Sequence, residues 1–160
     1  MQGQTKTRLL LCGLLWALSS IARAQPLDAS HMSAAPESLT EHLAVLEDPS
    51  GQLSLAEVQS PALEAQFKTD LPAAESLNLG YTRSAFWLRL DLANNAEQPI
   101  ERLLEIAYAR IGELQFYQSN AAGVYTSTLT GSNHAFASRP LKNRYFVFAL
   151  KLPAKAQQRY

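Results

Sequence analysis

The sequence predicts an all-β domain of the antiparallel sandwich or barrel type, preceded by an export signal. Apolar and polar residues alternate along Phe86–Leu92 and again along Phe146–Leu152, which is the period of a half-buried strand. Turn-forming residues separate such runs at short intervals, and no long stretch has the period of a helix. Short strands with turn signals between them are typical of sandwiches and barrels.

The chain begins with the pattern of a Sec-type signal peptide. Lys6 and Arg8 precede an apolar run, Leu9–Ile21, and Ala24 ends a small-residue triplet before Gln25. This pattern predicts a signal peptide over residues 1–24, with cleavage between Ala24 and Gln25. The apolar run is shorter than the roughly 20 residues of a bilayer-spanning helix, so an uncleaved membrane anchor is the weaker alternative.

Export defines what chemistry the mature chain can carry. Cys12 is the single cysteine and would leave with the signal peptide, so the mature chain would have no disulfide and no thiolate. The same cleavage leaves eleven basic and fourteen acidic residues, a formal net charge of −3, and a negative net charge does not favour binding to nucleic acid. We expect one domain, working in the periplasm or outside the cell.

The first part of the mature chain is predicted to contain little regular structure. Residues 25–38 have no apolar period and are expected to form a flexible leader. A first strand over His42–Glu47 should end at the turn Asp48–Gly51. Ser54 with Glu57 has the form of a capping box, and Ser60-Pro61 resembles a second helix start, so we expect short helical turns in this connection.

The clearest strand follows. Phe86, Leu88, Leu90 and Leu92 should share its inward face, with Trp87 and its alternate neighbours on the other face. Further strands are predicted over residues 102–109, 113–118, 124–129 and 145–152, and in the last of these Phe146, Phe148, Leu150 and Leu152 should point inward.

The end of the chain resembles the start of another strand. Gln158–Tyr160 has no turn after it and no closing partner, which would expose a sheet edge of the kind that natural proteins usually cover. We therefore expect the domain, residues 39–160, to be truncated at its C-terminal end or to be a fragment of a longer protein.

Several short segments resemble one family when they are taken in order. They are Glu47–Gly51, Leu77–Arg89, Leu103–Ile106, Leu114–Tyr117, Thr130–Gly131 and Arg139–Pro140. In this order they resemble 7TMR-DISMED2, the periplasmic sensor module of bacterial seven-transmembrane receptors with diverse intracellular signalling modules. The resemblance spans about His42 to Tyr160, and Ser84–Arg89 is its most specific segment.

The resemblance implies a jelly-roll sandwich, like those of carbohydrate-binding modules, that senses a ligand outside the inner membrane. The ligand of such domains is often taken to be a carbohydrate. Family members continue through a final strand into seven membrane helices and a cytoplasmic output module, such as a histidine kinase or diguanylate cyclase, and this sequence contains none of those parts. Two alternatives remain: a free secreted module that binds glycans or a protein without signalling, and a structural domain whose open edge strand pairs with another chain.

The candidate ligand-binding residues are aromatic and basic. Trp87 and Arg89 lie opposite the aliphatic row, and Tyr117 and Tyr145 are outward residues of other strands. An aromatic ring can stack on a sugar, while a guanidinium donates to hydroxyl or carboxylate oxygens. The alternative is structural, with Trp87 in the core and Arg89 paired beside it.

Arg139 and Arg144 bracket the loop before the last complete strand, where binding residues are common. They are further candidates for ligand contact, although salt bridges to Glu105 or Glu113 would explain them as well.

Metal binding and catalysis have little support. Asp91, Asn94 and Asn95, or Asp48, could supply oxygen ligands to calcium, but they are also ordinary turn residues and no EF-hand spacing is present. The three histidines have no ligand spacing, and no catalytic or phosphate-binding motif occurs. We therefore predict a binding domain that is not an enzyme and uses no cofactor or metal.

Overall fold

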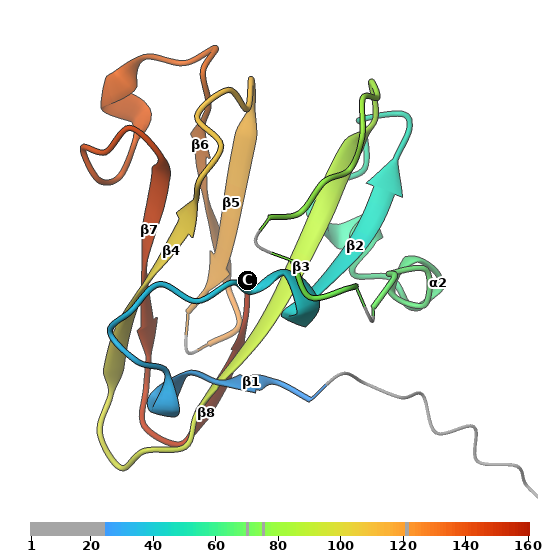
Figure 1. Ribbon diagram of the computed structural model, residues 1–160. Coiled ribbons are helices and arrows are strands. Elements are labelled where there is room, and N and C mark those ends of the chain that lie inside the picture. Colours follow the sequence, from blue (N-terminus) through green and yellow to red (C-terminus); the bar gives the residue numbers. More distant parts are fainter. Residues whose placement is uncertain (1–24, 70, 75, 121) are drawn as a thin grey trace, which may run out of the picture.

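The computed structural model describes residues 25–69, 71–74, 76–120 and 122–160, so the predicted signal peptide and its cysteine lie outside the described residues. The described strands form a sandwich-like all-β domain, as predicted (Figure 1). One sheet contains β1 (Leu27–Asp28), β2 (Leu43–Asp48), β3 (Ala85–Asn94) and β8 (Ala156–Arg159). The other strands form two antiparallel pairs, β4 (Ile100–Ile106) with β7 (Phe146–Leu152) and β5 (Leu114–Ser119) with β6 (Tyr125–Thr130).

Strand β3 is the centre of the first sheet and changes partners halfway along its length. Its first half, Ala85–Leu90, pairs with β2. Its second half, Asp91–Asn94, pairs with β8, while the two residues of β1 run parallel to it beside Leu92. The predicted entry to another strand at the chain end is therefore β8, and it continues to Tyr160, which exchanges two backbone hydrogen bonds with Leu90.

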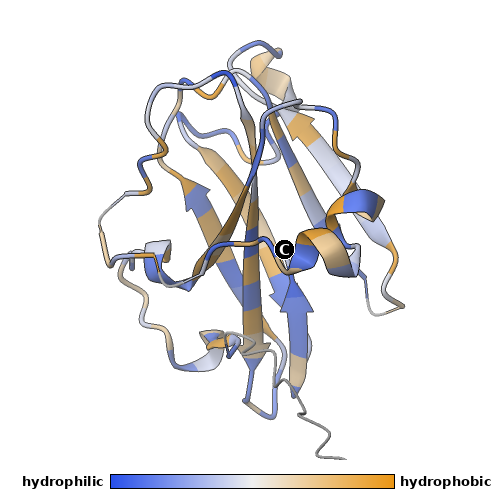
Figure 2. Ribbon diagram, turned by 90° about the vertical axis from the view of Figure 1, so that its right-hand side faces the viewer, coloured by the Kyte–Doolittle hydropathy of each residue, from blue (hydrophilic) through white to orange (hydrophobic). Residues whose placement is uncertain are grey.

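The predicted inward rows form the core. The row on β7 is buried, and Leu90 and Leu92 of β3 pack into the same cluster. Phe116 of β5 stacks on Phe148 with 4.1 Å between ring centroids, which joins the β5–β6 pair to the β4–β7 pair. Hydrophobic and hydrophilic residues follow one another along the strands in Figure 2, as burial of one strand face requires.

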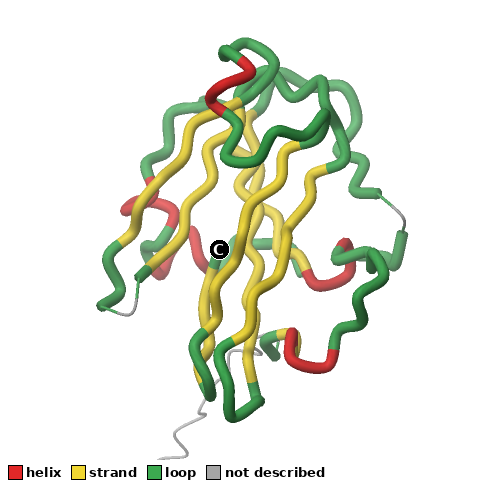
Figure 3. The backbone as a smooth tube through the Cα atoms, turned by 90° about the vertical axis from the view of Figure 1, so that its left-hand side faces the viewer, coloured by secondary structure: helices red, strands yellow, loops and turns green. Residues whose placement is uncertain are grey.

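The connection between β2 and β3 contains the two short helices that the sequence predicts, α1 (Leu55–Val58) and α2 (Pro61–Glu64). The capping box is present, because Ser54 accepts a hydrogen bond from the Glu57 amide while the Glu57 carboxylate accepts from Ser54. Three 3₁₀ helices complete the helical turns: η1 (Ala29–His31), η2 (Thr40–His42) and η3 (Phe136–Ser138). Figure 3 shows all of these turns in the connections between strands.

The segment expected to be a flexible leader is different in the structure. Leu27–Asp28 adds a strand to the first sheet, and Ala29 is fully buried in the core. Asp28 caps η1 through Ser30, and the Arg102 side chain donates to the Ala29 carbonyl. The sequence shows no period here because only two or three residues enter the sheet, and their burial depends on partners about seventy positions away in the chain.

The first half of β3 has one open edge. The N–H and C=O of Leu90 bond to Tyr160 and so point away from β2, and these groups alternate sides along an antiparallel strand. The backbone groups of Phe86 and Leu88 therefore face the same open side, and no described residue bonds to them there. Leu88 belongs to the predicted inward row, yet it is 42 % exposed beside this edge, which no strand of the described residues covers.

Strand β5 presents a matching edge. Its Ser119 carbonyl accepts a hydrogen bond from Gln158 of β8, so this side of β5 faces β8 and β3. By the same alternation, the backbone groups of Gln115 and Tyr117 point toward that side and have no partner among the described residues. The open edges of β3 and β5 thus face each other beyond Tyr160.

Among the helices of the described residues, none has the length and apolar character that a membrane crossing requires.

Candidate functional site

The outward face of β3 carries the candidate site. Trp87, Arg89 and Asp91 alternate with the core row, so all three point away from the sandwich interior. Trp87 stacks on Tyr117 of β5, with 5.6 Å between ring centroids and 20° between ring planes. Burial raises the pKa of the Tyr117 hydroxyl, so this ring stays neutral well above physiological pH.

Arg89 lies beside this aromatic pair on the same strand and is held by acidic partners. Its Nη1 lies 2.8 Å from Glu64 Oε1, and its Nε lies 3.8 Å from Asp91 Oδ2. The guanidinium also lies 4.6 Å from the ring centroid of Phe67. Nη1 is buried but makes no well-aligned hydrogen bond among the described residues, so its contact with Glu64 is an ion pair with donor capacity left over.

Arg159 of β8 completes the charge cluster. It donates to both carboxylate oxygens of Asp91, at 2.7 and 2.9 Å, and to Glu64 at 2.9 Å. The hydrogen bonds to Asp91 are the main reason that the pKa of the Arg159 guanidinium is raised above the usual range. Two arginines and two carboxylates therefore form a neutral, partly buried network, which we call the Arg89 network: Arg89, Arg159, Glu64 and Asp91.

A small cavity lies next to Arg89. It encloses about 50 Å³ and is lined by Gln25, Glu41, His42, Leu43, Ala44, Thr69, Arg89 and Asp91. A single water needs about 10–15 Å³ measured in this way, so the cavity has room for a few waters. Ligand pockets for drug-sized molecules enclose about 300–1,000 Å³, so this cavity does not surround a sugar ring. A ligand of that size would lie on the surface, across Trp87, Tyr117 and Arg89.

Arg139 and Arg144, the two other candidates, lie at a different place in the fold. Arg139 donates to the backbone carbonyls of Asn143 and Arg144, and its guanidinium lies 4.5 Å from the ring centroid of the buried Phe146. Arg144 lies over the ring of Tyr145. Neither arginine forms an ion pair with a described residue, so the salt bridges considered from the sequence are absent from that part of the chain.

The residues considered for calcium all have structural partners. Asp91 belongs to the Arg89 network, and Asn95 donates to Asp28. Asn94 donates to three backbone carbonyls, and Asp48 accepts from its own turn. Within the described residues, no cluster of three or more His, Cys, Asp or Glu side chains could hold a metal ion.

Sequence reasoning predicted some of these neighbouring residues as ligand-binding candidates and missed others. It identified Trp87, Arg89 and Tyr117 from strand alternation, and the structure brings these three together. It missed Glu64, Phe67 and Arg159. Arg159 lies at an alternate position of a short strand, which is a weak signal, whereas nothing in the sequence predicts that Glu64 reaches β3 and β8.

Comparison with known proteins identifies the domain type. The sequence matches the family described as 7TMR-DISM extracellular 2 over residues 40–160. No curated protein matches the chain at a significant level.

Proposed function

This chain belongs to the 7TMR-DISM extracellular 2 family, and on that premise we propose that it binds a small, carbohydrate-like molecule as the input domain of a seven-transmembrane receptor. Membership of a family of extracellular domains implies a location in the periplasm or outside the cell. In this proposal the domain binds without catalysing a reaction. Its bound and free forms would bias a membrane-embedded region of the receptor, because binding outside can act inside only through two states of the whole protein.

The stacked pair of Trp87 and Tyr117 beside Arg89 carries the proposal. The aromatic faces offer the apolar surface on which the C–H groups of a sugar stack. Arg89 lies next to them on the same strand with 14 % of its side chain exposed, and an arginine fork suits vicinal hydroxyls or a carboxylate. The acidic partners on both sides of Arg89 fix its position before binding, which lowers the conformational entropy that a ligand must offset.

The size of the neighbouring cavity indicates the mode of binding. Because about 50 Å³ holds only water, the ligand would rest on an open platform rather than in an enclosed pocket. A platform contact buries little ligand surface. We therefore expect a dissociation constant nearer the millimolar than the nanomolar range for a monosaccharide, with longer oligosaccharides binding more tightly.

The fluorescence of Trp87 tests this proposal directly. The chain has two tryptophans, and Trp16 lies in the predicted signal peptide, so Trp87 is the only fluorophore of this kind in the chain from Gln25 onward. The compounds to titrate are neutral sugars, uronic acids and cell-wall oligosaccharides. We expect at least one of them to shift the Trp87 emission, with a shift that saturates as its concentration rises. The same compound should raise the melting temperature.

Matched variants separate the site from the fold. Tyr117→Ala should weaken the affinity for that ligand about tenfold, whereas Tyr108→Ala, at an exposed tyrosine of the loop between β4 and β5, should leave the affinity unchanged. Arg89→Ala should have a similar effect to Tyr117→Ala, with Arg110→Ala as its control. If Arg89→Ala unfolds the domain, Arg89→Lys keeps the charge and removes only the fork. Equal affinity in the site variants and in their controls would overturn the proposal, as would no emission shift with any compound.

A further inference from the structure

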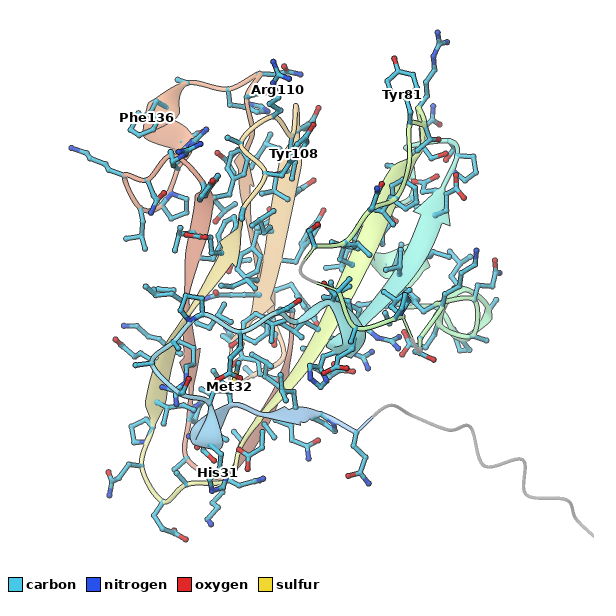
Figure 4. All side chains as sticks on the ribbon, in the orientation of Figure 1. His31, Met32, Tyr81, Tyr108, Arg110 and Phe136 are labelled. Atoms are coloured by element: carbon cyan, nitrogen blue, oxygen red, sulfur yellow. The ribbon has the colours of Figure 1, made fainter. Side chains whose placement is uncertain are left out.

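One end of the sandwich gathers the tips of several loops. Strands β2, β4 and β6 end there, and β3, β5 and β7 begin there (Figure 1). The loops at this end cover residues 49–54, 76–84, 107–113 and 131–145, and we call them the tip loops. Figure 4 shows Tyr81, Tyr108, Arg110 and Phe136 projecting at this end, with His31 and Met32 at the opposite end.

Large apolar side chains project from three of the tip loops. Tyr81 is fully exposed, Tyr108 is 62 % exposed and Phe136 is 56 % exposed, and Leu141, in the same loop as Phe136, is 40 % exposed. Single exposed apolar residues are ordinary on a protein surface. Here Tyr81, Tyr108 and Phe136 come from segments far apart in the sequence and all lie at one end of the fold (Figure 4).

The same loops carry a strong excess of positive charge. They contain the basic residues Arg83, Arg110, Arg139, Lys142 and Arg144, and one acidic residue, Glu113. Arg83, Arg110 and Lys142 are exposed and have no hydrogen-bond or ion-pair partner among the described residues. The acidic residues at the adjacent end of β2 are occupied, since Glu47 accepts from Ser84 and Asp48 from its own turn.

The opposite end has no such excess. Its loops, residues 95–99, 120, 122–124 and 153–155, contain Glu97 and Lys155, which pair with each other at 2.8 Å. The domain as a whole has a slight negative charge after the predicted signal peptide is removed. The positive charge of the tip loops is therefore a local feature of one end and does not reflect the overall composition.

We propose that the tip loops dock on an anionic phospholipid membrane surface. Basic side chains are attracted to anionic headgroups, and tyrosine and phenylalanine rings favour the boundary between headgroups and acyl chains. A hydrated anionic polysaccharide would satisfy the charges but would leave Leu141 and Phe136 in water, so the membrane fits the observations better. Membrane docking by the tip loops fits membership of a family named for seven-transmembrane receptors, and it does not depend on ligand binding at Trp87, Tyr117 and Arg89.

Vesicle flotation tests the proposal. The chain purified after export is mixed with vesicles of 70 % phosphatidylcholine and 30 % phosphatidylglycerol, or of phosphatidylcholine alone, in low-salt buffer. We expect flotation with the anionic vesicles only, and its loss as salt is raised. Lys142→Glu should lower the partition constant by about fivefold for the positive charge that it removes, and further for the negative charge that it adds.

Two control variants match the tested changes. Lys151→Glu makes the same charge change at an exposed lysine on the last part of β7, away from the tip loops, and should bind like the unmodified chain. Leu141→Ser should weaken flotation, whereas Leu103→Ser, at an exposed leucine of β4, should not. All variants share one N-terminus, checked by mass spectrometry, so residues 1–24 cannot cause a difference among them.

Three results would overturn the proposal. The first is absence of flotation with anionic vesicles. The second is an equal loss of binding with Lys142→Glu and Lys151→Glu, which would indicate attraction without a defined surface. The third is retention on an immobilised anionic polysaccharide, polygalacturonate, that Lys142→Glu abolishes while vesicles do not bind; the tip loops would then serve a glycan.

Discussion

At the scale of single residues, Asp48 shows how one buried carboxylate organises a turn. It is 2 % exposed and accepts hydrogen bonds from Ser50 and Gly51 on one oxygen and from the Leu53 amide on the other. These bonds, the one from the Ser50 side chain first, hold the pKa of Asp48 below its usual value of 3.8. Gly51 has a positive φ of 64°, which glycine adopts without strain.

The lowered pKa of Asp48 predicts acid sensitivity. A carboxylate whose folded pKa is depressed contributes stability that is present above its unfolded pKa, near 3.8, and lost as the pH falls toward the folded value. We expect the urea concentration at the midpoint of unfolding to decrease when the pH is lowered below 4. The Asp48→Asn variant should be less stable at pH 7, and its midpoint should change less with pH. The pKa of Glu57 is also lowered, mainly by the hydrogen bond from the Ser54 side chain, so Glu57 contributes to the pH dependence in the same direction. If the midpoint of Asp48→Asn depends on pH as strongly as that of the unmodified chain, Asp48 is not the cause of the acid sensitivity.

At the scale of elements, the open edges of β3 and β5 are the distinctive feature. Backbone groups of Phe86, Leu88, Gln115 and Tyr117 face one another without partners among the described residues, and the stack of Trp87 on Tyr117 crosses between the strands. An open edge is a place where another strand can pair.

These edges predict an alternating pattern of hydrogen exchange along β3. The amides of Trp87 and Arg89 bond to β2 and should exchange slowly, while those of Phe86 and Leu88 should exchange fast in the same strand. On β5, Tyr117 should exchange faster than Phe116. Amide-resolved exchange by NMR measures each position. Uniform protection along Phe86–Arg89 would mean that a partner strand covers the edge in solution.

At the scale of the whole molecule, Asn94 joins the two layers. This residue ends β3 and is completely buried. Its side-chain amide donates to the carbonyls of Leu152, the last residue of β7, of Pro153 and of Gln98, while its oxygen accepts from the Ala96 amide. Both the amide group and the oxygen of Asn94 are therefore used to hold the turn after β3 to the turn after β7.

Asn94→Asp tests this link with almost no change of shape. The new oxygen would face three carbonyl oxygens where an N–H₂ group now donates, and a buried group left unsatisfied is costly. We expect a loss of about 3 kcal/mol or more in the free energy of unfolding, measured by urea denaturation at pH 7. Asn143→Asp is the control, because Asn143 is exposed and its oxygen only accepts from Tyr145. Similar stability of the two variants would contradict the role of Asn94.

The sequence by itself determined the longer strands, the two short helical turns with the capping box of the first, and the inward rows of β3 and β7, because alternation and capping act between residues close in the chain. It also placed Trp87 and Arg89 on one face. Only the tertiary structure decided that Arg159 would meet Glu64, ninety-five positions away, that Ala29 would enter the core, and that Leu88 would lie exposed in an inward row. These outcomes depend on which strands become neighbours, and that choice follows from packing the whole chain at once.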